Sequence, residues 1–395
     1  MYLKLVTSAI KIKSSPRDFR VEEQISLPLQ ARGPYGLYRL WKKELTTVQA
    51  LGRLSRHCGV PEGEIRYGGK KDRHAETVQF VTVPSSRNVT YKAEDLQCDF
   101  WGYAEEPMGP RWIRNNRFRL VLRGIASLRE AQDLCGKAKS ISLRGMPNYY
   151  DDQRFGSQGS SSEFFAEKLL HQNPSEALRL YFTETHPEAP ARVRRRNAMI
   201  SRYWGDWRKI YPFCKKGIHR KILAVLRRDS SLQGFWEALN LLPREELGLY
   251  LSAFQSFLWN CLLEKHLFPE ETKKEKLVLF CGPWQFAGAF SGENVFSEPC
   301  MIPSHAAEVP AMEKKLERLW MEVLEECSLS PEAFALPELR KAYFGSFLRP
   351  SVIFPEDVEG EAEPEESGET FKITLSFALP RGSYATLFIK MLAIL

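Results

Sequence analysis

A nine-residue run near the C-terminal end of the chain alternates between apolar and polar side chains. Residues 371–379 are apolar at every odd position, while positions 372, 374 and 376 are polar. A period of two places the apolar side chains on one face of a β-strand. One covered face and one solvated face are typical of antiparallel sheets, so the run predicts a half-buried strand in such a sheet. Its apolar members are Phe371, Ile373, Leu375, Phe377 and Leu379.

The chain is too long for one typical hydrophobic core. It has 395 residues, of which 43% are hydrophobic and 27% charged, so two globular domains are expected. Further strands are predicted at residues 38–41, 77–83 and 118–122. A helix capped by Thr46 or Thr47 should end at Gly59, a longer helix should span 247–267, and about ten helical residues should follow Ser383.

Charge is distributed unevenly around a formal net charge of +7. Residues 192–228 hold 13 Lys or Arg, one acidic residue and several interleaved aromatic side chains. This stretch suits a polyanionic partner, although basic solvated faces of amphipathic helices are the alternative. Residues 356–369 hold eight acidic side chains and no basic ones, with Gly and Pro among them. That composition predicts a flexible, solvated loop between two strands.

The eight cysteines are scattered, with no C-x-x-C pair and no histidine at zinc-finger spacing. Such scatter indicates reduced thiols in a cytoplasmic protein, and no metal site is expected. The first 13 residues do not resemble a signal peptide, and no apolar run approaches 18 residues, so no membrane span is expected either.

The segment 65–75, IRYGGKKDRHA, is predicted to be a loop whose side chains could take part in catalysis or binding. Its two glycines allow a tight turn and close approach of a ligand. Asp72 then sits among four basic side chains, which favour its ionised form and so suit a nucleophile or a base. The same cations could hold a phosphate. A charged surface turn with local ion pairs is the alternative interpretation of so short a pattern.

Six segments in order along the chain resemble motifs of the TruD family of pseudouridine synthases. The loop sequence GGKKDRHAETVQ at 68–79 is similar to the family's G-x-K-D-x-x-A-x-T-x-Q. The remaining similarities are KSSPRDFRVEE at 13–23, Asn116-Arg117-Phe118, PNYYDDQRFG at 147–156, SAFQSFLWN at 252–260 and LPRGSYAT at 379–386. One such match is weak, but six in the family's order are specific.

The resemblance implies an isomerase that converts uridine to pseudouridine in tRNA, typically at position 13 in the D arm, without cofactor or metal. Asp72 would be the essential aspartate, acting on the sugar C1′, on the base, or on the proton at C2′. Phe118 would stack on the flipped target base, and Asn116 would position the loop or the base edge. A core position beside Leu120 and Leu122 is the alternative for Phe118.

The resemblance also concerns residues for which more than one role is open. Lys13 could pair with Asp72 or a phosphate, or be a solvated lysine. Lys71 could bind substrate, and Gln79 and the segment 148–156 would shape the pocket. Arg154 could be structural or could touch RNA. Ser252, Gln255, Ser256 and Asn260 could line a site or pack their helix. Lys390 departs from the Arg-Glu pair of bacterial relatives, and a lysine lacks the bidentate fork of arginine.

The resemblance also implies the fold, a mixed α/β (α+β) pseudouridine-synthase core with a long, mainly antiparallel sheet, interrupted by an inserted α/β TRUD domain. The catalytic domain would comprise about 1–158 and 342–395, and the insertion about 159–341. A monomer is expected. The basic stretch would then lie in the insertion and contact tRNA phosphates. The expected contacts are Arg194, Arg195, Arg196, Lys215, Lys216, Arg220 and Lys221.

Two other functions compete with the isomerase. One is an RNA-binding protein that keeps the fold but has no catalytic activity, against which the intact loop and Phe118 argue. The other is a hydrolase with Asp72 as nucleophile, which lacks a companion phosphate loop or metal-ligand cluster.

Overall fold

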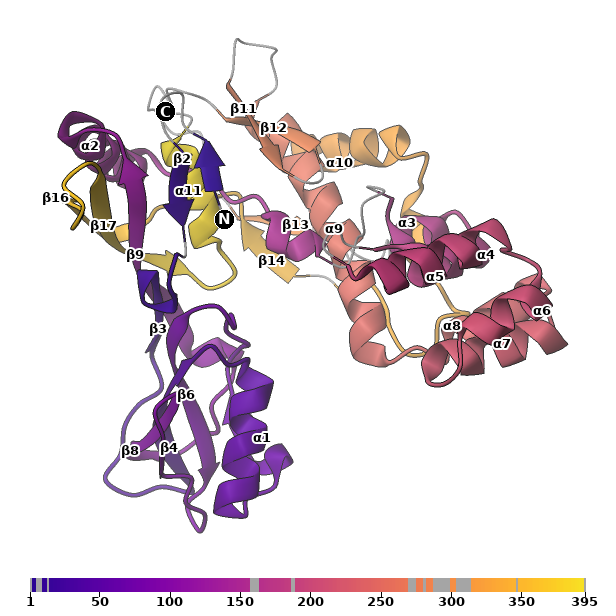
Figure 1. Cartoon of the computed structure of the whole chain (residues 1–395), viewed down its shortest axis with the longest axis horizontal. Coiled ribbons are helices and arrows are strands. Elements are labelled where there is room, and N and C mark those ends of the chain that lie inside the picture. The colour runs from indigo at the N-terminus through magenta and orange to yellow at the C-terminus, as the bar shows by residue number, and fades with distance from the viewer. Residues whose placement is uncertain are drawn as a thin grey trace. The chain divides into compact units, whose positions relative to one another are not determined.

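A computed structural model of the chain describes residues 2–4, 9–12, 14–156, 163–185, 189–268, 275–279, 282–286, 299–302, 314–345 and 347–393. The fold consists of two compact units (Figure 1). The first contains the described residues up to Met146 and from Ile353 onward, and the second contains those from Pro147 to Val352. The division into a catalytic domain and an insertion, with limits near 158 and 342, remains a prediction from the sequence.

An 11-stranded sheet organises the first unit, with strand order β1-β2-β9-β3-β6-β4-β8-β7, while β17 pairs with β9, β16 with β17, and β5 with β6. Within this sheet β3 and β6 run parallel, and the other described pairings are antiparallel. The mixed, mainly antiparallel sheet confirms that part of the predicted fold. Its strands are β1 Tyr2–Lys4, β2 Ala9–Ile12, β3 Phe19–Ile25, β4 Tyr35–Lys43, β5 Arg66–Tyr67, β6 Glu76–Pro84, β7 Tyr91–Lys92, β8 Leu96–Ala104, β9 Ile113–Ile125, β16 Glu356–Pro364 and β17 Phe371–Pro380.

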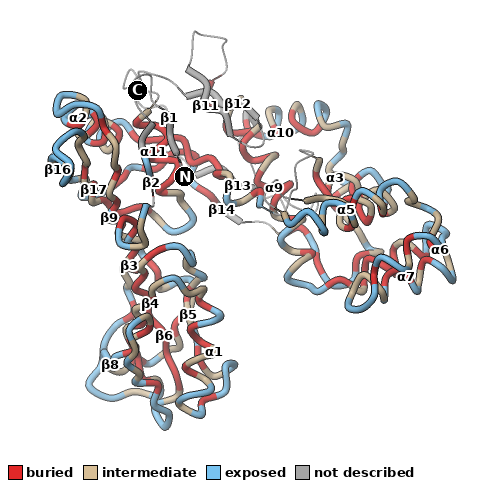
Figure 2. Tube along the Cα trace, viewed as in Figure 1, coloured by how far each residue is buried: buried red, intermediate tan, exposed pale blue. Residues whose placement is uncertain are grey.

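Helix α1, Thr47–Cys58, covers β4, β6 and β8 and closes one hydrophobic core (Figure 2). Its N-cap is Thr46, which forms a reciprocal capping box with Gln49, and Gly59 ends it at φ 66°. The predicted helix is confirmed because both end signals are local. Three short 3-10 turns complete the connections here: η1 Pro16–Asp18, η2 Glu62–Glu64 and η3 Pro110–Trp112.

Strands β9 and β17 build a second core with helices α2, Leu128–Arg144, and α11, Ala385–Leu392. The predicted alternation of 371–379 is confirmed, since Ile373, Leu375, Phe377 and Leu379 are all buried. Phe377 meets Phe388 of α11 with ring centroids 4.4 Å apart.

The acidic stretch 356–369 is not the loop predicted from its composition. Its first nine residues form β16, paired antiparallel with β17, and only the tip between the strands is irregular. Charged side chains are compatible with an edge strand, because one side of it meets solvent. Gly360 is needed for packing, since a Cβ there would lie 2.9 Å from Cys135 Sγ of α2.

The described part of the second unit is mainly helical. The long helix α9, Arg244–Leu267, buries Leu251, Phe254 and Leu258, as predicted for 247–267. Around it lie α3 Phe165–Leu170, α4 Pro174–Thr183, α5 Ala191–Arg202, α6 Trp207–Ile210, α7 Ile218–Arg228, α8 Leu232–Leu239 and α10 Lys314–Glu326, with 3-10 turns η4 Asp152–Phe155, η5 Tyr211–Phe213 and η6 Pro331–Phe334. Two two-stranded ribbons are also present: β11 Glu275–Leu279 with β12 Gly282–Phe286, and β13 Pro299–Ile302 with β14 Phe347–Pro350. A third ribbon, β10 Met146–Pro147 with β15 Val352–Ile353, comprises the residues at which the chain passes from one unit to the other.

Candidate active site

The loop that carries Asp72 connects β5 to β6 in the first unit. Gly68 allows it to pass close to β9, because a Cβ at this position would lie 2.6 Å from Ile113 Cδ1. A larger residue would push the loop away from the sheet, so the lack of space explains why a glycine stands here.

Buried polar side chains fix the backbone of the loop from α1 and β6. The Lys71 amide donates to Thr47 Oγ1 at 2.9 Å, and this hydroxyl in turn donates to Gln79 Oε1 at 2.9 Å. The Gln79 amide nitrogen reaches back to the Gly69 carbonyl oxygen at 3.4 Å. Thr47 and Gln79 are both buried, so these bonds are sheltered from water. Gln79 therefore shapes the loop.

The Lys71 side chain links the loop to β3 and β9. Its Nζ lies 2.8 Å from Glu23 Oε1 and donates to Asn116 Oδ1 at 2.7 Å. The Glu23 side chain is fully buried, and its second oxygen accepts the Phe80 amide at 3.0 Å. With this ion pair, this hydrogen bond and a side chain only 10% exposed, Lys71 helps to hold the loop against β3 and β9.

A second lysine, Lys42 of β4, is fully buried beneath the same loop. Its Nζ donates to the carbonyl oxygens of Leu45 at 2.6 Å, Asp72 at 2.8 Å and Lys71 at 3.5 Å. Burial lowers the pKa of this ammonium to about 8, an effect that the nearby Asp72 carboxylate partly offsets. The sequence reasoning did not single out Lys42. The available signal was its position in the alternation Tyr38, Leu40, Lys42, which places a lysine on the covered face of a strand.

Asp72 itself is exposed, as are its neighbours Lys70, Arg73 and His74. The site thus combines a carboxylate that faces solvent with a backbone held by side chains from α1, β3, β4, β6 and β9. Such a carboxylate can act as a nucleophile or as a base on a substrate that arrives from solution, because the loop does not have to be ordered first.

Phe118 lies on the same face of β9 as Asn116 but belongs to an aromatic core. Its ring stacks on Phe377 with centroids 5.5 Å apart and meets the edge of Phe19 at 6.3 Å. It is 8% exposed, as the core alternative predicted. In this arrangement little of the Phe118 residue is accessible to a base.

Arg154 and the segment around it lie in the second unit and bind α9. Arg154 Nε donates to Ser256 Oγ at 3.0 Å. Asn260 accepts from the Tyr150 amide at 2.8 Å and donates to the Tyr150 carbonyl at 3.0 Å. The matches at 147–156 and 252–260 therefore hold each other together, which favours a structural role for Arg154.

The two remaining lysines suggested by the sequence lie near the ends of the chain. Lys13 is outside the described residues. Lys390 is 6% exposed on α11, so it is a buried position of the first unit rather than a solvated one.

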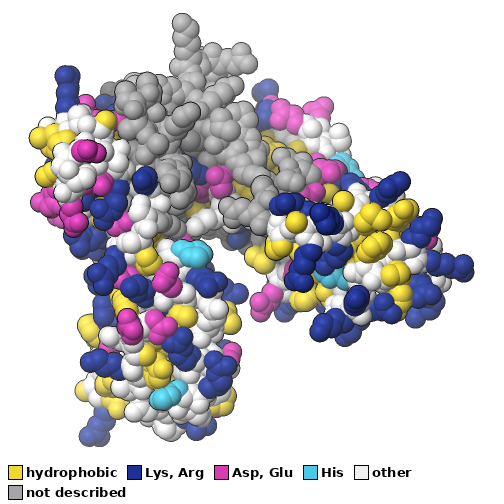
Figure 3. Space-filling view, in the orientation of Figure 1, with side chains coloured by type: hydrophobic (Ala, Val, Ile, Leu, Met, Phe, Trp, Pro, Cys, Tyr) yellow, Lys and Arg dark blue, Asp and Glu magenta, His cyan; other side chains and the backbone are white. Residues whose placement is uncertain are grey.

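The basic stretch 192–228 forms helices α5 to α7 in the second unit, and Figure 3 shows Lys and Arg side chains gathered over this helical part. Five of the seven predicted RNA contacts are exposed, namely Arg194, Arg195, Lys215, Lys216 and Lys221. Arg196 and Arg220 are half-buried. Arg220 stacks 3.4 Å from the Tyr211 ring centroid and donates to the Tyr211 carbonyl at 3.2 Å, so it stabilises the local fold.

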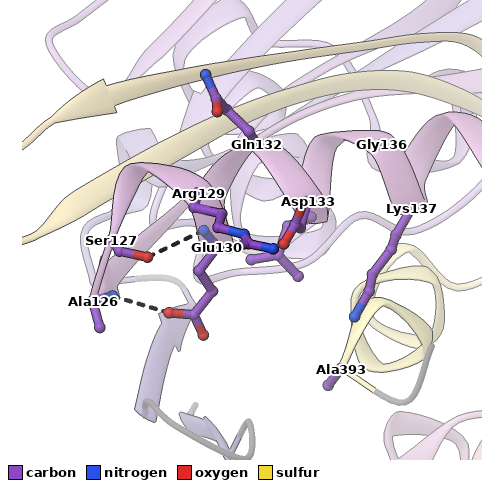
Figure 4. Close-up of a pocket in the computed structure, with 10 residues that line it drawn as sticks. Ala126, Ser127, Arg129, Glu130, Gln132, Asp133, Gly136, Lys137 and Ala393 are labelled. Atoms are coloured by element: carbon purple, nitrogen blue, oxygen red, sulfur yellow. Dashed lines mark hydrogen bonds between the residues drawn. The ribbon is translucent and has the colours of Figure 1, made fainter.

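A groove of about 770 Å³ lies along α2 in the first unit (Figure 4). Its polar groups are partly used to cap the helix: Ser127 Oγ accepts the Glu130 amide at 3.2 Å, and the Glu130 carboxylate accepts the Ala126 amide at 3.3 Å. None of the predicted site residues lines this groove.

The described ranges contain no group of three His, Cys, Asp or Glu side chains arranged so as to hold a metal ion. No helix in the part of the chain that the structure covers is long and apolar enough to cross a bilayer.

Comparisons with known proteins agree along almost the whole chain. A family model described as tRNA pseudouridine synthase D (TruD) matches residues 4–278 and 296–392. A relative from Methanococcus maripaludis, named "Probable tRNA pseudouridine synthase D 1", is 30% identical over 96% of this chain and 98% of its own length. The tRNA pseudouridine synthase D of Aquifex aeolicus is 27% identical over 97% of this chain and 98% of its own length.

A solved structure supports the fold. The crystal structure of a tRNA pseudouridine synthase D from Methanosarcina mazei matches with a TM-score of 0.72, covering 100% of this chain and 95% of that one. The two sequences are 20% identical, so this likeness concerns the architecture alone.

Proposed function

The chain belongs to the tRNA pseudouridine synthase D (TruD) family, and from this premise we propose that it converts uridine to pseudouridine in tRNA, at position 13, with Asp72 as the catalytic carboxylate. Members of the family are isomerases. The base leaves C1′ through its N1, rotates, and rejoins C1′ through C5, while the proton released from C5 is balanced by one taken up at N1. Because the reaction involves no net transfer of electrons, it requires no redox cofactor.

One observation carries the proposal: the exposed Asp72 carboxylate stands on a loop whose backbone is bonded to side chains of the surrounding sheet and helix. A carboxylate kept in one place spares the reaction the cost of ordering it. It can attack C1′, add to the base, or take the proton at C2′, and all three acts need the same presentation.

Other residues would meet two further requirements of the reaction. A uridine in folded tRNA must be flipped out before reaction, and stacking on an aromatic ring returns about 1–3 kcal/mol of that cost. Phe118 is the proposed aromatic partner, and Asn116 would meet the base edge or keep Lys71 in place. The exposed cations of α5 and α7 and of the segment between them would bind tRNA phosphates.

The test is pseudouridine mapping on a tRNA transcript incubated with the purified protein and no added cofactor. We expect product at position 13, and none when that uridine is replaced by cytidine. Asp72→Asn should lower the rate by on the order of 10³-fold or more, because the amide is neither nucleophile nor base. The described bond from Lys42 to this residue goes to its backbone, so the substitution leaves that anchor intact.

Asp99→Asn is the matched control, since Asp99 is an exposed aspartate of β8 in the same unit. It should keep the wild-type rate. If the wild type binds tRNA but forms no pseudouridine at any position, the catalytically inactive RNA-binding alternative is correct. If Asp72→Asn retains the rate, the catalytic assignment is wrong.

A further inference from the structure

Lys42 is an unusual residue to find inside a protein. Lysine is almost never fully buried unless its charge is paired, and burial of an unpaired ammonium is strongly unfavourable. Lys42 is 0% exposed, and each of its described hydrogen bonds goes to a backbone carbonyl. Three carbonyl oxygens match the three N–H donors of an ammonium, so the side chain is satisfied as a hydrogen-bond donor.

The three carbonyls belong to two segments that the ammonium ties together. Leu45 precedes the N-cap of α1, whereas Lys71 and Asp72 are consecutive residues of the loop between β5 and β6. From the other side, the Lys71 amide donates to Thr47 in the first turn of α1. The backbone at Lys71 and Asp72 is therefore held at one amide, that of Lys71, and at both carbonyl oxygens. These bonds fix the direction in which the Asp72 side chain leaves the backbone.

The charged groups that act on Lys42 come from the loop. Across β6 and β8 its strand partners are Thr77 and Leu96, which are uncharged. The charges that act on the ammonium are Asp72, which attracts it, and Lys71, which repels it. A positive charge directly beneath the proposed catalytic carboxylate thus affects both the position and the electrostatic environment of that carboxylate.

We propose that Lys42 is a positioning residue of the active site, whose buried ammonium holds the backbone at Lys71 and Asp72 so that the Asp72 carboxylate stays in its reactive orientation. This role rests on the proposed function of Asp72. Lys42 does not touch the reacting atoms and acts through the loop.

The first experiment compares Lys42→Met with Lys43→Met in single-turnover pseudouridine formation on tRNA. Methionine keeps the length and packing of the buried side chain but removes its charge and donors. Lys43 is the next residue of the same strand and is only half-buried, which makes it the matched control. We expect Lys42→Met to lower the maximal single-turnover rate constant by on the order of 10²-fold, with the half-saturating enzyme concentration changed by less than about threefold, since misplacement of a catalytic group slows the chemical step. Lys43→Met should leave both constants near wild type.

Amide hydrogen exchange gives a measurement that does not depend on activity. The Lys71 amide, bonded to Thr47, reports directly on opening of the loop. It should exchange about tenfold faster or more in Lys42→Met than in wild type, with no change in Lys43→Met. If wild type forms no pseudouridine, the proposed function fails while this measurement still decides whether Lys42 orders the loop. Unchanged exchange in a folded Lys42→Met protein overturns the inference.

A pH series on the wild type needs no substitution and covers the case in which Lys42→Met does not fold. Because burial brings the Lys42 pKa to about 8, the side chain gives up its charge and one donor as pH rises through that value. The single-turnover rate should then fall above about pH 8 by up to tenfold per pH unit. Lys43→Met should show the same fall. A wild-type rate that stays level from about pH 7 to pH 9.5 overturns the inference, as does a fall that persists unchanged in active Lys42→Met.

Discussion

At the scale of single residues, the ion pair between Lys71 and Glu23 is buried, so the loss of either partner alone should be costly. Its atoms lie 2.8 Å apart, with side chains 10% and 0% exposed. Removal of one partner from a buried pair leaves the other charge without compensation. We expect Lys71→Met to reduce the free energy of unfolding by about 3–5 kcal/mol, measured by urea denaturation.

The double substitution Lys71→Met with Glu23→Gln should cost less than Lys71→Met alone, because no charge is then left buried. Arg39→Met provides the comparison for a partly exposed pair, since Arg39 and Glu22 lie 3.1 Å apart with side chains 28% and 39% exposed. It should cost less than about 1 kcal/mol. Equal effects of Lys71→Met and Arg39→Met would show that burial does not strengthen the inner pair.

Lys42 should make stability depend on pH in a direction opposite to activity. Its pKa falls from 10.5, the ordinary value, to about 8 in the folded protein. Between these values the unfolded chain binds more protons than the folded chain, so the free energy of unfolding rises with pH. The rise should reach about 3 kcal/mol between about pH 8 and pH 10.5, at roughly 1.36 kcal/mol per pH unit. Denaturation of wild type and Lys42→Met across this range isolates the Lys42 contribution, and identical pH profiles would contradict it.

These residues also show which parts of the candidate site could be predicted from the sequence and which could not. Asp72 and the loop could be identified because their glycines, charges and motif are contiguous. The partners of Lys71 could not, since Glu23 and Asn116 are 48 and 45 positions away along the chain and meet it only through the strand order β9-β3-β6. A buried lysine such as Lys42 contradicts the usual exposure of its residue type, so composition gives no indication of it.

At the scale of elements, signals that act within a few residues gave accurate predictions, and signals averaged over composition did not. The capping box at Thr46 and the alternation of 371–379 each depend on local geometry, and both elements are present. The acidic content of 356–369 suggested a loop, but tertiary pairing with β17 outweighs composition when the charged side chains can face solvent.

Gly360 offers a test of how closely β16 packs on α2. A Cβ at this position would lie 2.9 Å from Cys135 Sγ and 3.1 Å from Leu375 Cδ2. We expect Gly360→Ala to lower the free energy of unfolding by about 1–3 kcal/mol through overpacking. Cys135→Ala in the same chain should restore part of that stability. Gly63→Ala is the control because nothing lies within 4 Å of a Cβ there. If Gly360→Ala is as mild as Gly63→Ala, the strand and helix have more room than the distances to Cys135 and Leu375 indicate.

At the scale of the whole molecule, the motifs that indicate the family are spread over almost the entire chain. The structural roles of these motifs differ from one another. Some of the motif residues surround Asp72 in the first unit, while those at 147–156 and 252–260 bind each other in the second. A sequence match identifies both groups equally, because it records which residues are present and not which neighbours they bind.

The basic helices of the second unit provide the last prediction, which concerns affinity for tRNA. Lys215 and Lys216 are exposed, whereas Arg220 is stacked on Tyr211 and bonded to the backbone. Lys215→Gln with Lys216→Gln should weaken tRNA binding and reduce the slope of log affinity against log salt by about 1 for each phosphate that the protein no longer neutralises. Arg220→Gln should instead lower the thermal midpoint, because it removes a packed side chain.

The control for this experiment removes the same charge elsewhere. Lys92 and Lys139 are exposed lysines of the first unit, and their joint change to Gln alters the net charge equally. If the salt slope reflects phosphate binding by the stretch 192–228, the control keeps the wild-type slope while the Lys215 and Lys216 variant does not. If both variants shift affinity by the same amount, tRNA responds to the overall charge of +7 rather than to these helices, and the basic stretch is a solvated face.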